Sequence, residues 1–159
     1  MPPGLAGVAG ARYDSPMPMT YRIDLANCVV WTRAWGELTD EELVAHARHL
    51  RADPRFAPNF RQFFSAEAST GGAAGVSREG LRQAAQLNPF GEGARRAVVA
   101  DNDVAVGLAR MYEMMRGDAA DVMMGFRDRA AALEWLGLPA TWEPPPAAPS
   151  DPILDSSHP

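Results

Sequence analysis

A short polar run contains the side chains of this sequence best suited to hold a ligand. Asp101, Asn102 and Asp103 follow an apolar segment and precede a helical pattern. Their carboxylate and amide oxygens are suited to coordinate a cation or to hydrogen-bond a small polar ligand. The same residue types cap helix N-termini by accepting hydrogen bonds from the first free amide groups. Capping is the simpler interpretation, because three short polar residues in a row do not specify a metal.

A second polar group, Glu67, Ser69 and Thr70, follows the segment FRQFFSA. We interpret that segment as a parallel strand, which places the group beyond its carboxyl end, where open α/β sheets bind ligands. The run 101–103 follows a neighbouring strand at the same edge. Together, Glu67 and the run form a predicted ligand or partner surface. A polar loop without function accounts for the same residues.

The sequence offers little to support catalysis or metal binding. His46 and His49 are three residues apart on a predicted helix, where His46 borders the apolar stripe and His49 faces outward. A metal site needs further ligands, and the only cysteine is Cys28. All basic residues are arginine, which excludes a lysine Schiff base and a phosphate-binding P-loop. We therefore predict a non-catalytic protein without metal or cofactor.

Methionines gather in the last third of the chain. Met111, Met115 and Met123 fall within or just after an amphipathic helical pattern. Thioether side chains repack easily, so they are suited to line an adaptable pocket for a small apolar ligand. Ordinary core packing explains the same spacing.

Composition limits the possible partners and location. The chain has 159 residues and a net charge of −5, with its arginines scattered, which argues against nucleic-acid binding. No apolar run reaches the length of a membrane span, and the N-terminus does not resemble a signal peptide. A cytoplasmic protein is the expectation. Trp31 and Trp35 share one strand face, which would suit a protein partner or a second copy unless a helix covers them.

Alternation and helical spacing predict one α/β domain with the element order β-β-α-β-α-β-α-β-α. The first two strands form an antiparallel hairpin, whose turn at Ala26-Asn27 suits the tolerance of asparagine for positive φ. Later crossovers make the remaining strands parallel, and four helices cover the mixed five-stranded sheet. The expected strands are 19–25, 28–36, 60–66, 98–100 and 122–126, and helices follow N-caps at Thr39, Ser77, the 101–103 run and Asp128. We expect a disordered leader at 1–18, the domain at 19–138 and an unstructured proline-rich tail at 139–159.

Four stretches resemble the SpoIIAA-like group of small bacterial proteins, which are relatives of STAS domains. They read GELTDEEL, LRADPRF, ARRAVVADNDVAVGLARMYEMM and FRDRAAALEWLGL. The resemblance implies the same α/β fold. It also implies candidate phosphoacceptors, because STAS regulators of the anti-sigma-antagonist type carry a phosphorylated Ser or Thr at the start of the second helix. Ser69, Thr70 and Ser77 occupy that region, but Ala68 replaces the aspartate of the usual motif.

Two functional hypotheses follow. The first is a STAS-like regulatory or protein-interaction module that acts through the 65–77 loop and the 101–104 turn. The alternative is a small-molecule or lipid carrier, which the resemblance suggests because the lipid-binding CRAL-TRIO proteins share the fold. Such a carrier would use an apolar pocket beside the methionine-rich helix.

Overall fold

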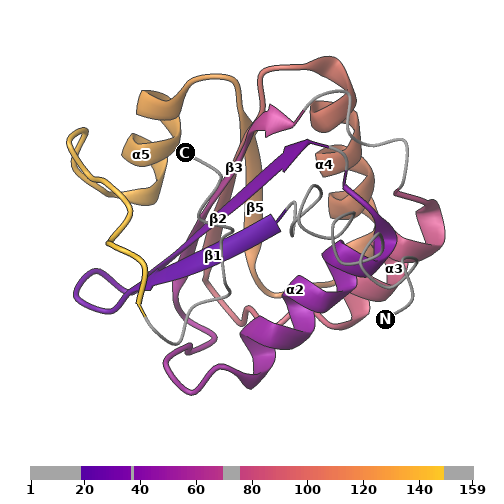
Figure 1. Cartoon of the computed structure of the whole chain (residues 1–159), viewed down its shortest axis with the longest axis horizontal. Helices are drawn as coiled ribbons and strands as arrows, with labels where there is room; N and C mark the ends of the chain where they lie inside the picture. The colour runs from indigo at the N-terminus through magenta and orange to yellow at the C-terminus, as the bar shows by residue number, and fades with distance from the viewer. Residues whose placement is uncertain (1–18, 37, 70–75, 149–159) are drawn as a thin grey trace, which may run out of the picture.

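The computed structural model describes residues 19–36, 38–69 and 76–148, and these residues form five strands and four helices. The predicted element order is confirmed (Figure 1). The predicted leader at 1–18, Thr70 and the end of the chain at 149–159 lie outside the described residues. The elements are β1 (Met19–Asp24), β2 (Val29–Gly36), α2 (Asp40–Ala52), β3 (Arg61–Ser69), α3 (Arg78–Gln86), β4 (Arg95–Val99), α4 (Asp103–Arg116), β5 (Val122–Phe126) and α5 (Arg129–Leu136).

The strands lie in the sheet in chain order, from β1 to β5. The pairing of β1 with β2 is antiparallel, and β2 to β5 are mutually parallel, as predicted. One detail of the hairpin prediction is wrong. The residue with positive φ is Cys28, at 56°, whereas Asn27 bonds the Asp24 carboxylate through its main-chain and side-chain nitrogens, at 3.1 and 2.8 Å.

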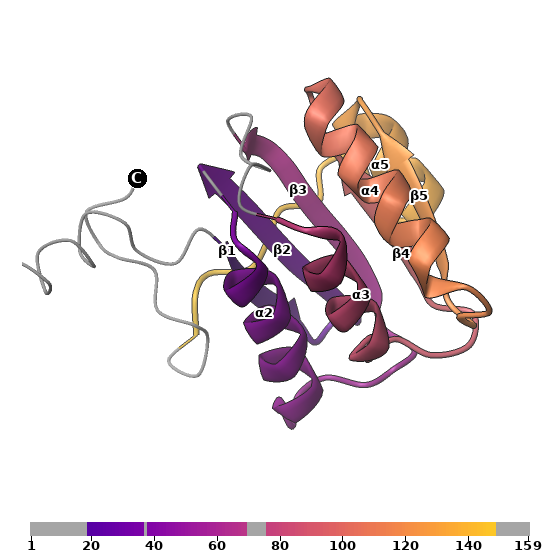
Figure 2. The ribbon, with the colours of Figure 1, turned by 90° about the vertical axis from the view of Figure 1, so that its right-hand side faces the viewer.

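Helices cover both faces of the sheet. Figure 2 shows α2, α3 and α4 on one face and α5 behind the other. Alternation along the strands directs side chains to opposite faces. Val29 and Trp31 pack with Leu133 in the α5 core, while Val30 packs with Leu50 on the α2 face. Trp31 is therefore buried rather than part of an exposed patch. No helix of the described residues has the length and apolarity needed to cross a membrane.

Helix starts follow the predicted caps. The side chains of Thr39, Ser77, Asn102 and Asp128 each accept a hydrogen bond from a main-chain N–H of the first helical turn. The buried stripe of α2 consists of Val44, Ala47 and Leu50, and the predicted Leu43 is only half-buried.

The third strand is longer than predicted. β3 continues to Ser69, and its last residues pair in parallel register with Trp35 and Gly36 of β2. Glu67 and Ser69 therefore belong to a strand rather than to a loop. Cross-strand hydrogen bonds extend this segment, which lacks the β-branched residues that mark a strand locally.

Residues 139–148 are not an unstructured tail. Trp142 is 5% exposed and its ring lies 5.9 Å from that of Phe63. Its indole Nε1 donates to Asp24 at 2.9 Å, and the Arg22 guanidinium donates to the carbonyl of Pro145 at 3.0 Å. Prolines keep this segment out of helices and strands, but one buried tryptophan fixes it against the sheet.

Candidate functional site

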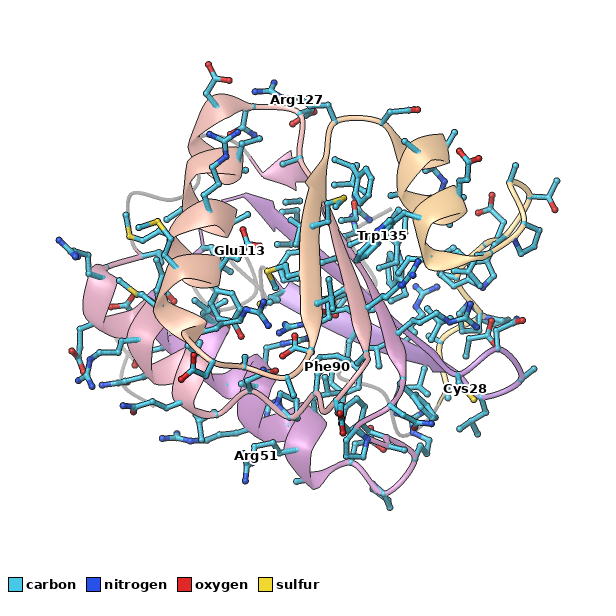
Figure 3. All side chains as sticks on the ribbon, turned by 180° about the vertical axis from the view of Figure 1, so that it is seen from behind. Cys28, Arg51, Phe90, Glu113, Arg127 and Trp135 are labelled. Carbon is cyan, nitrogen blue, oxygen red and sulfur yellow. The ribbon has the colours of Figure 1, made fainter. Side chains whose placement is uncertain are left out.

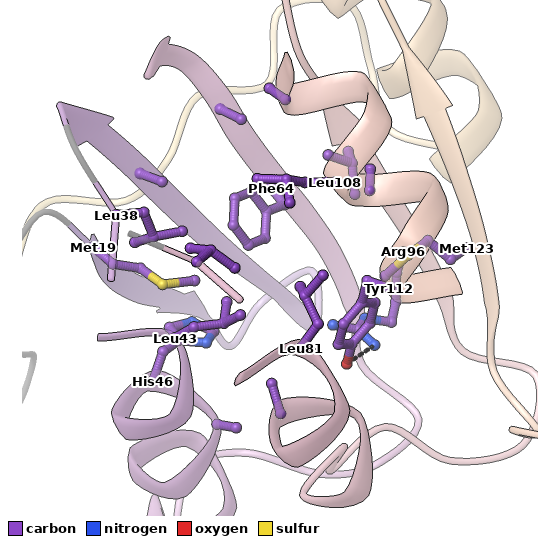
Figure 4. A pocket seen from close by; sticks show the side chains of 18 of the residues that line it. Met19, Leu38, Leu43, His46, Phe64, Leu81, Arg96, Leu108, Tyr112 and Met123 are labelled. Atoms are coloured by element: carbon purple, nitrogen blue, oxygen red, sulfur yellow. Dashed lines mark hydrogen bonds between the residues drawn. The ribbon is translucent and has the colours of Figure 1, made fainter. Parts of the chain in front are cut away.

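A cavity of about 110 Å³ lies between the sheet and helices α2, α3 and α4 (Figure 4). Small side chains open this space. Ala47, Ala84 and Ala109 stand on the three helices, facing the sheet residues Ala34 and Ala66. Alanine leaves room that larger core residues would fill, because protein interiors otherwise pack closely. The larger wall residues are mostly apolar and include Met19, Leu38, Phe64, Leu81, Leu108 and Met123.

A chain of buried polar side chains runs across the sheet beneath this cavity. Nε of Arg96 donates to Oε1 of Gln62 at 2.9 Å, and Nε2 of Gln62 donates to the Thr32 hydroxyl at 2.9 Å. Thr32 lies 3.1 Å from Nε2 of His46 on α2. The Thr32 hydroxyl can donate its proton to His46 while it accepts a hydrogen bond from Gln62. Each hydrogen bond in the series is then donated in the direction from Arg96 to His46. Such a chain satisfies polar groups that burial would otherwise penalise.

His46 is neutral at neutral pH. Its pKa is lowered to about 3, mainly by burial and to a smaller extent by the positive charges of Arg96 and His49. A neutral imidazole has one ring nitrogen free to accept, which matches the bond from Thr32. His49 is exposed, as predicted. His46 is thus a half-buried histidine bonded to the sheet.

Arg96 also belongs to a buried group of charges, which we call the arginine cluster and define as Arg96, Arg116 and Asp121. The Asp121 carboxylate lies 3.3 Å from Nη1 of Arg96 and 2.5 Å from Nη1 of Arg116. Asn88 donates to its other oxygen at 2.8 Å. The Arg96 guanidinium carbon is 4.4 Å from the centre of the Phe90 ring, a cation–π contact that fixes the guanidinium plane.

The run 101–103 mainly shapes the start of α4. Asn102 accepts a hydrogen bond from the main-chain N–H of Ala105 at 2.8 Å, so it is the N-cap. Asp101 and Asp103 are exposed, and Asp103 pairs with Arg127 at 2.5 Å. Figure 3 shows Arg127 just beyond the end of β5. None of these residues borders the cavity.

Among the candidate phosphoacceptors, Ser77 has the clearest surroundings. Its hydroxyl accepts from the N–H of Gly80 at 3.0 Å and donates to the Asp40 carboxylate of α2 at 2.5 Å. Ser77 is exposed, and this contact joins the first turns of α2 and α3. Ser69 is the last residue of β3.

The predicted methionine pocket is placed differently. Met123 lines the cavity, whereas Met111 and Met115 are half-buried on α4 and are not among the lining residues. Leu108 and Tyr112 form the α4 wall in their place.

Sequence reasoning missed the polar chain, although a signal was available. Thr32, Gln62 and Arg96 interrupt strand segments that are otherwise apolar or aromatic on the same face. A buried polar residue is more informative than an exposed apolar one. Three such interruptions on adjacent strands would have indicated a polar network beneath the helices.

Comparisons with known proteins identify the fold. No protein-family model and no curated protein sequence matches this chain. The chain is similar to the crystal structure of an uncharacterised DUF3478-family protein with a SpoIIAA-like fold from Shewanella loihica PV-4. The TM-score is 0.50 at 16% identity, over 74% of this chain and 93% of that protein. The resemblance of the sequence to SpoIIAA-like proteins is confirmed at the level of the fold.

Proposed function

We propose that this protein binds a small, largely apolar molecule in the cavity beneath α2, α3 and α4. The observation that carries the proposal is the cavity itself, which has apolar walls and polar groups gathered on a few side chains. This combination is typical of small-molecule sites, where apolar surface provides affinity and a few polar groups orient the ligand.

The size of the cavity limits the ligand. Its volume of about 110 Å³ is below the roughly 150 Å³ of an engineered cavity that binds benzene, and far below the ~300–1,000 Å³ of drug-sized sites. The cavity is partly open to solvent. We therefore infer a compact molecule, or a single alkyl chain whose end extends through the opening, rather than a phospholipid with two chains.

The proposed role is binding or carriage rather than catalysis. Three polar side chains border the cavity among the described residues, namely His46, Arg96 and Tyr112. Nε2 of His46 is bonded to Thr32. The Arg96 guanidinium is bonded to Gln62 and to the Asp121 carboxylate. This set supplies hydrogen bonds and charge to a ligand. It includes no carboxylate or aliphatic hydroxyl at the cavity wall to act as a base or nucleophile.

Titration with octan-1-ol, followed by amide NMR shifts, tests the proposal. We expect saturable shifts at residues that line the cavity, including Phe64 and Leu81. Leu108→Trp replaces an aliphatic side chain at the cavity wall by a bulkier indole ring and should weaken octan-1-ol binding at least tenfold. Met114→Trp is the matched control, because Met114 lies on the same helix and is 80% exposed. The proposal fails if shifts do not saturate, or if both variants bind octan-1-ol like the wild type.

A regulatory or protein-interaction role is the second candidate function. It would use the surface of the 65–77 segment and the 101–104 turn. The observation that favours it is the exposure of Ser77, Asp101 and Asp103, since β3 and β4 are adjacent and parallel and end at the same sheet edge. Phosphate on Ser77 would face the Asp40 carboxylate and should separate the first turns of α2 and α3 by charge repulsion.

Cross-linking in cells, followed by mass spectrometry, tests this second candidate. The comparison is between the wild type and a Ser77→Ala, Asp101→Ala, Asp103→Ala triple variant. Loss of a specific cross-linked protein from the variant would support an interaction surface. An unchanged set of cross-linked proteins would count against it.

A further inference from the structure

The arginine cluster beneath the cavity has an unbalanced charge. Arg96 and Arg116 both contact the carboxylate of Asp121, whose side chain is completely buried. The other side chains that bond Arg96, including Gln62 and Asn88, are neutral. Within the described residues, two positive charges therefore share one negative charge. A net charge is unfavourable in a buried, poorly hydrated site unless a counter-charge approaches it.

Arg96 and Tyr112, which line one end of the cavity, each have a hydrogen-bond donor that no described residue accepts. Arg96 lines the cavity and is only 6% exposed, so it is more than nine-tenths buried. Its Nε and Nη1 groups donate to protein acceptors, but no described residue accepts a hydrogen bond from Nη2. The Tyr112 hydroxyl accepts from Arg96 at 3.4 Å, and no side chain in the described ranges accepts its proton. Both groups would suit an acceptor from a ligand.

The opposite end of the cavity has no comparable charge. Figure 4 shows Met19, Leu38 and Leu43 at that end, together with His46, and Arg96 and Tyr112 at the other. Phe64 and Leu81 lie between the two ends. The cavity therefore has one cationic, donor-rich end and a mainly apolar remainder.

We propose that the ligand is a single-chain monocarboxylate, with its carboxylate at Arg96 and Tyr112 and its alkyl chain between Phe64 and Leu81. This inference rests on the proposed function and specifies its ligand class. One carboxylate supplies the one negative charge that the arginine cluster lacks. A phosphate monoester would bring nearly two charges at neutral pH, so it matches the cluster less well. A carboxylate oxygen also accepts strong hydrogen bonds from a guanidinium and a phenol.

Octanoate and octan-1-ol, compared by NMR titration at neutral pH, test the inference. The two probes share a chain length and differ in head-group charge. We expect the wild type to bind octanoate about tenfold more tightly, because a hydrogen bond to a charged group contributes more than one to a neutral group. Tyr112→Phe removes one donor without removing charge from the cluster. It should weaken octanoate binding several-fold and leave octan-1-ol binding unchanged.

Tyr21→Phe is the matched control, because its hydroxyl bonds Asp53 and Tyr21 does not line the cavity. It should leave both affinities unchanged. Equal wild-type affinity for the two probes would overturn the carboxylate inference while the proposed function stands. Binding of neither probe would overturn both. An octanoate preference unchanged in Tyr112→Phe would also overturn the head-group position. Arg96→Gln, where it folds, should abolish the preference.

Discussion

Single residues decide the chemistry of the sheet face beneath the helices. Thr32, Gln62 and Arg96 occupy buried positions where apolar residues would normally pack. They stay there because each finds a partner within the chain that links His46 to the arginine cluster. Burying these groups without partners would cost stability. Their retention places a neutral imidazole and a guanidinium at the wall of an otherwise apolar cavity.

The low pKa of His46 should make stability depend on pH. Its pKa is about 3 in the folded protein and 6.5 in the unfolded chain, so the unfolded chain takes up the proton first as pH falls. The stabilisation is complete above pH 6.5 and is lost between that value and about 3. We expect the free energy of unfolding to fall by roughly 1.4 kcal/mol per pH unit within this window. Urea unfolding at a series of pH values would measure the slope.

Two variants on α2 distinguish the contribution of His46 to the pH dependence from that of the neighbouring His49. His46→Gln keeps an acceptor for Thr32 but does not titrate, so the slope should largely disappear. His49→Gln changes the exposed histidine of the same helix and should retain the slope. A wild-type slope that persists in His46→Gln would contradict the assignment. The charges of Arg96 and His49 act on His46. Thr32 bonds its Nε2, and the rings of Tyr21 and Phe64 lie beside its imidazole.

At the scale of elements, local sequence patterns were sufficient for the order of strands and helices and for the helix caps. Thr39 and Ser77 cap helices through bonds to residues three positions away, so their role is visible in a short window. The end of β3 and the position of Trp142 were missed because they depend on contacts distant in sequence. Ser69 pairs with Gly36, and Trp142 bonds Asp24. Of the predicted methionine pocket only Met123 lines the cavity. The position of the cavity depends on how three helices approach the sheet, which local sequence patterns do not specify.

Two glycines in helices should respond oppositely to replacement by alanine. A Cβ at Gly80 of α3 would overlap with the Asp40 carboxylate, which also bonds Ser77. We expect Gly80→Ala to lower the free energy of unfolding by about 1–3 kcal/mol, because Asp40 must move away. Gly107 of α4 has open space at the same position, so Gly107→Ala should raise stability by about 0.5–1 kcal/mol.

Urea denaturation of both variants tests this pair. The Gly107→Ala result serves as the control for the general preference of helices for alanine over glycine. A neutral or stabilising effect of Gly80→Ala would show that the contact between Asp40 and the start of α3 does not hold α2 and α3 together in solution.

At the scale of the whole molecule, the segment 139–148 covers part of the sheet face on which α5 lies. Trp142 fills the α5 core beside Phe63 and connects to the first hairpin through Asp24. The sheet thus has a helix and an extended segment on one face, and three helices with the cavity on the other (Figures 1 and 2). The cavity and the Trp142 contacts therefore lie on opposite faces of the sheet.

Removal of the Trp142 side chain should therefore destabilise the whole domain. We expect Trp142→Ala to lower the free energy of unfolding by about 3–5 kcal/mol, as for other large core side chains. Trp142→Phe keeps the ring contact and loses the bond to Asp24, so it should cost less. Glu143→Ala changes an exposed neighbour and should stay within about 0.5 kcal/mol of the wild type. Equal stability of Trp142→Ala and the wild type would show that the segment does not pack as described.

A crystal structure of the protein grown with saturating octanoate would show whether the cavity beneath α2, α3 and α4 holds the ligand. We predict an alkyl chain between Phe64, Leu81 and Leu108, with the carboxylate within hydrogen-bond distance of Arg96 and Tyr112. A cavity without octanoate under those conditions, or a chain bound only on the outer surface, would contradict the claim that this cavity is the ligand site.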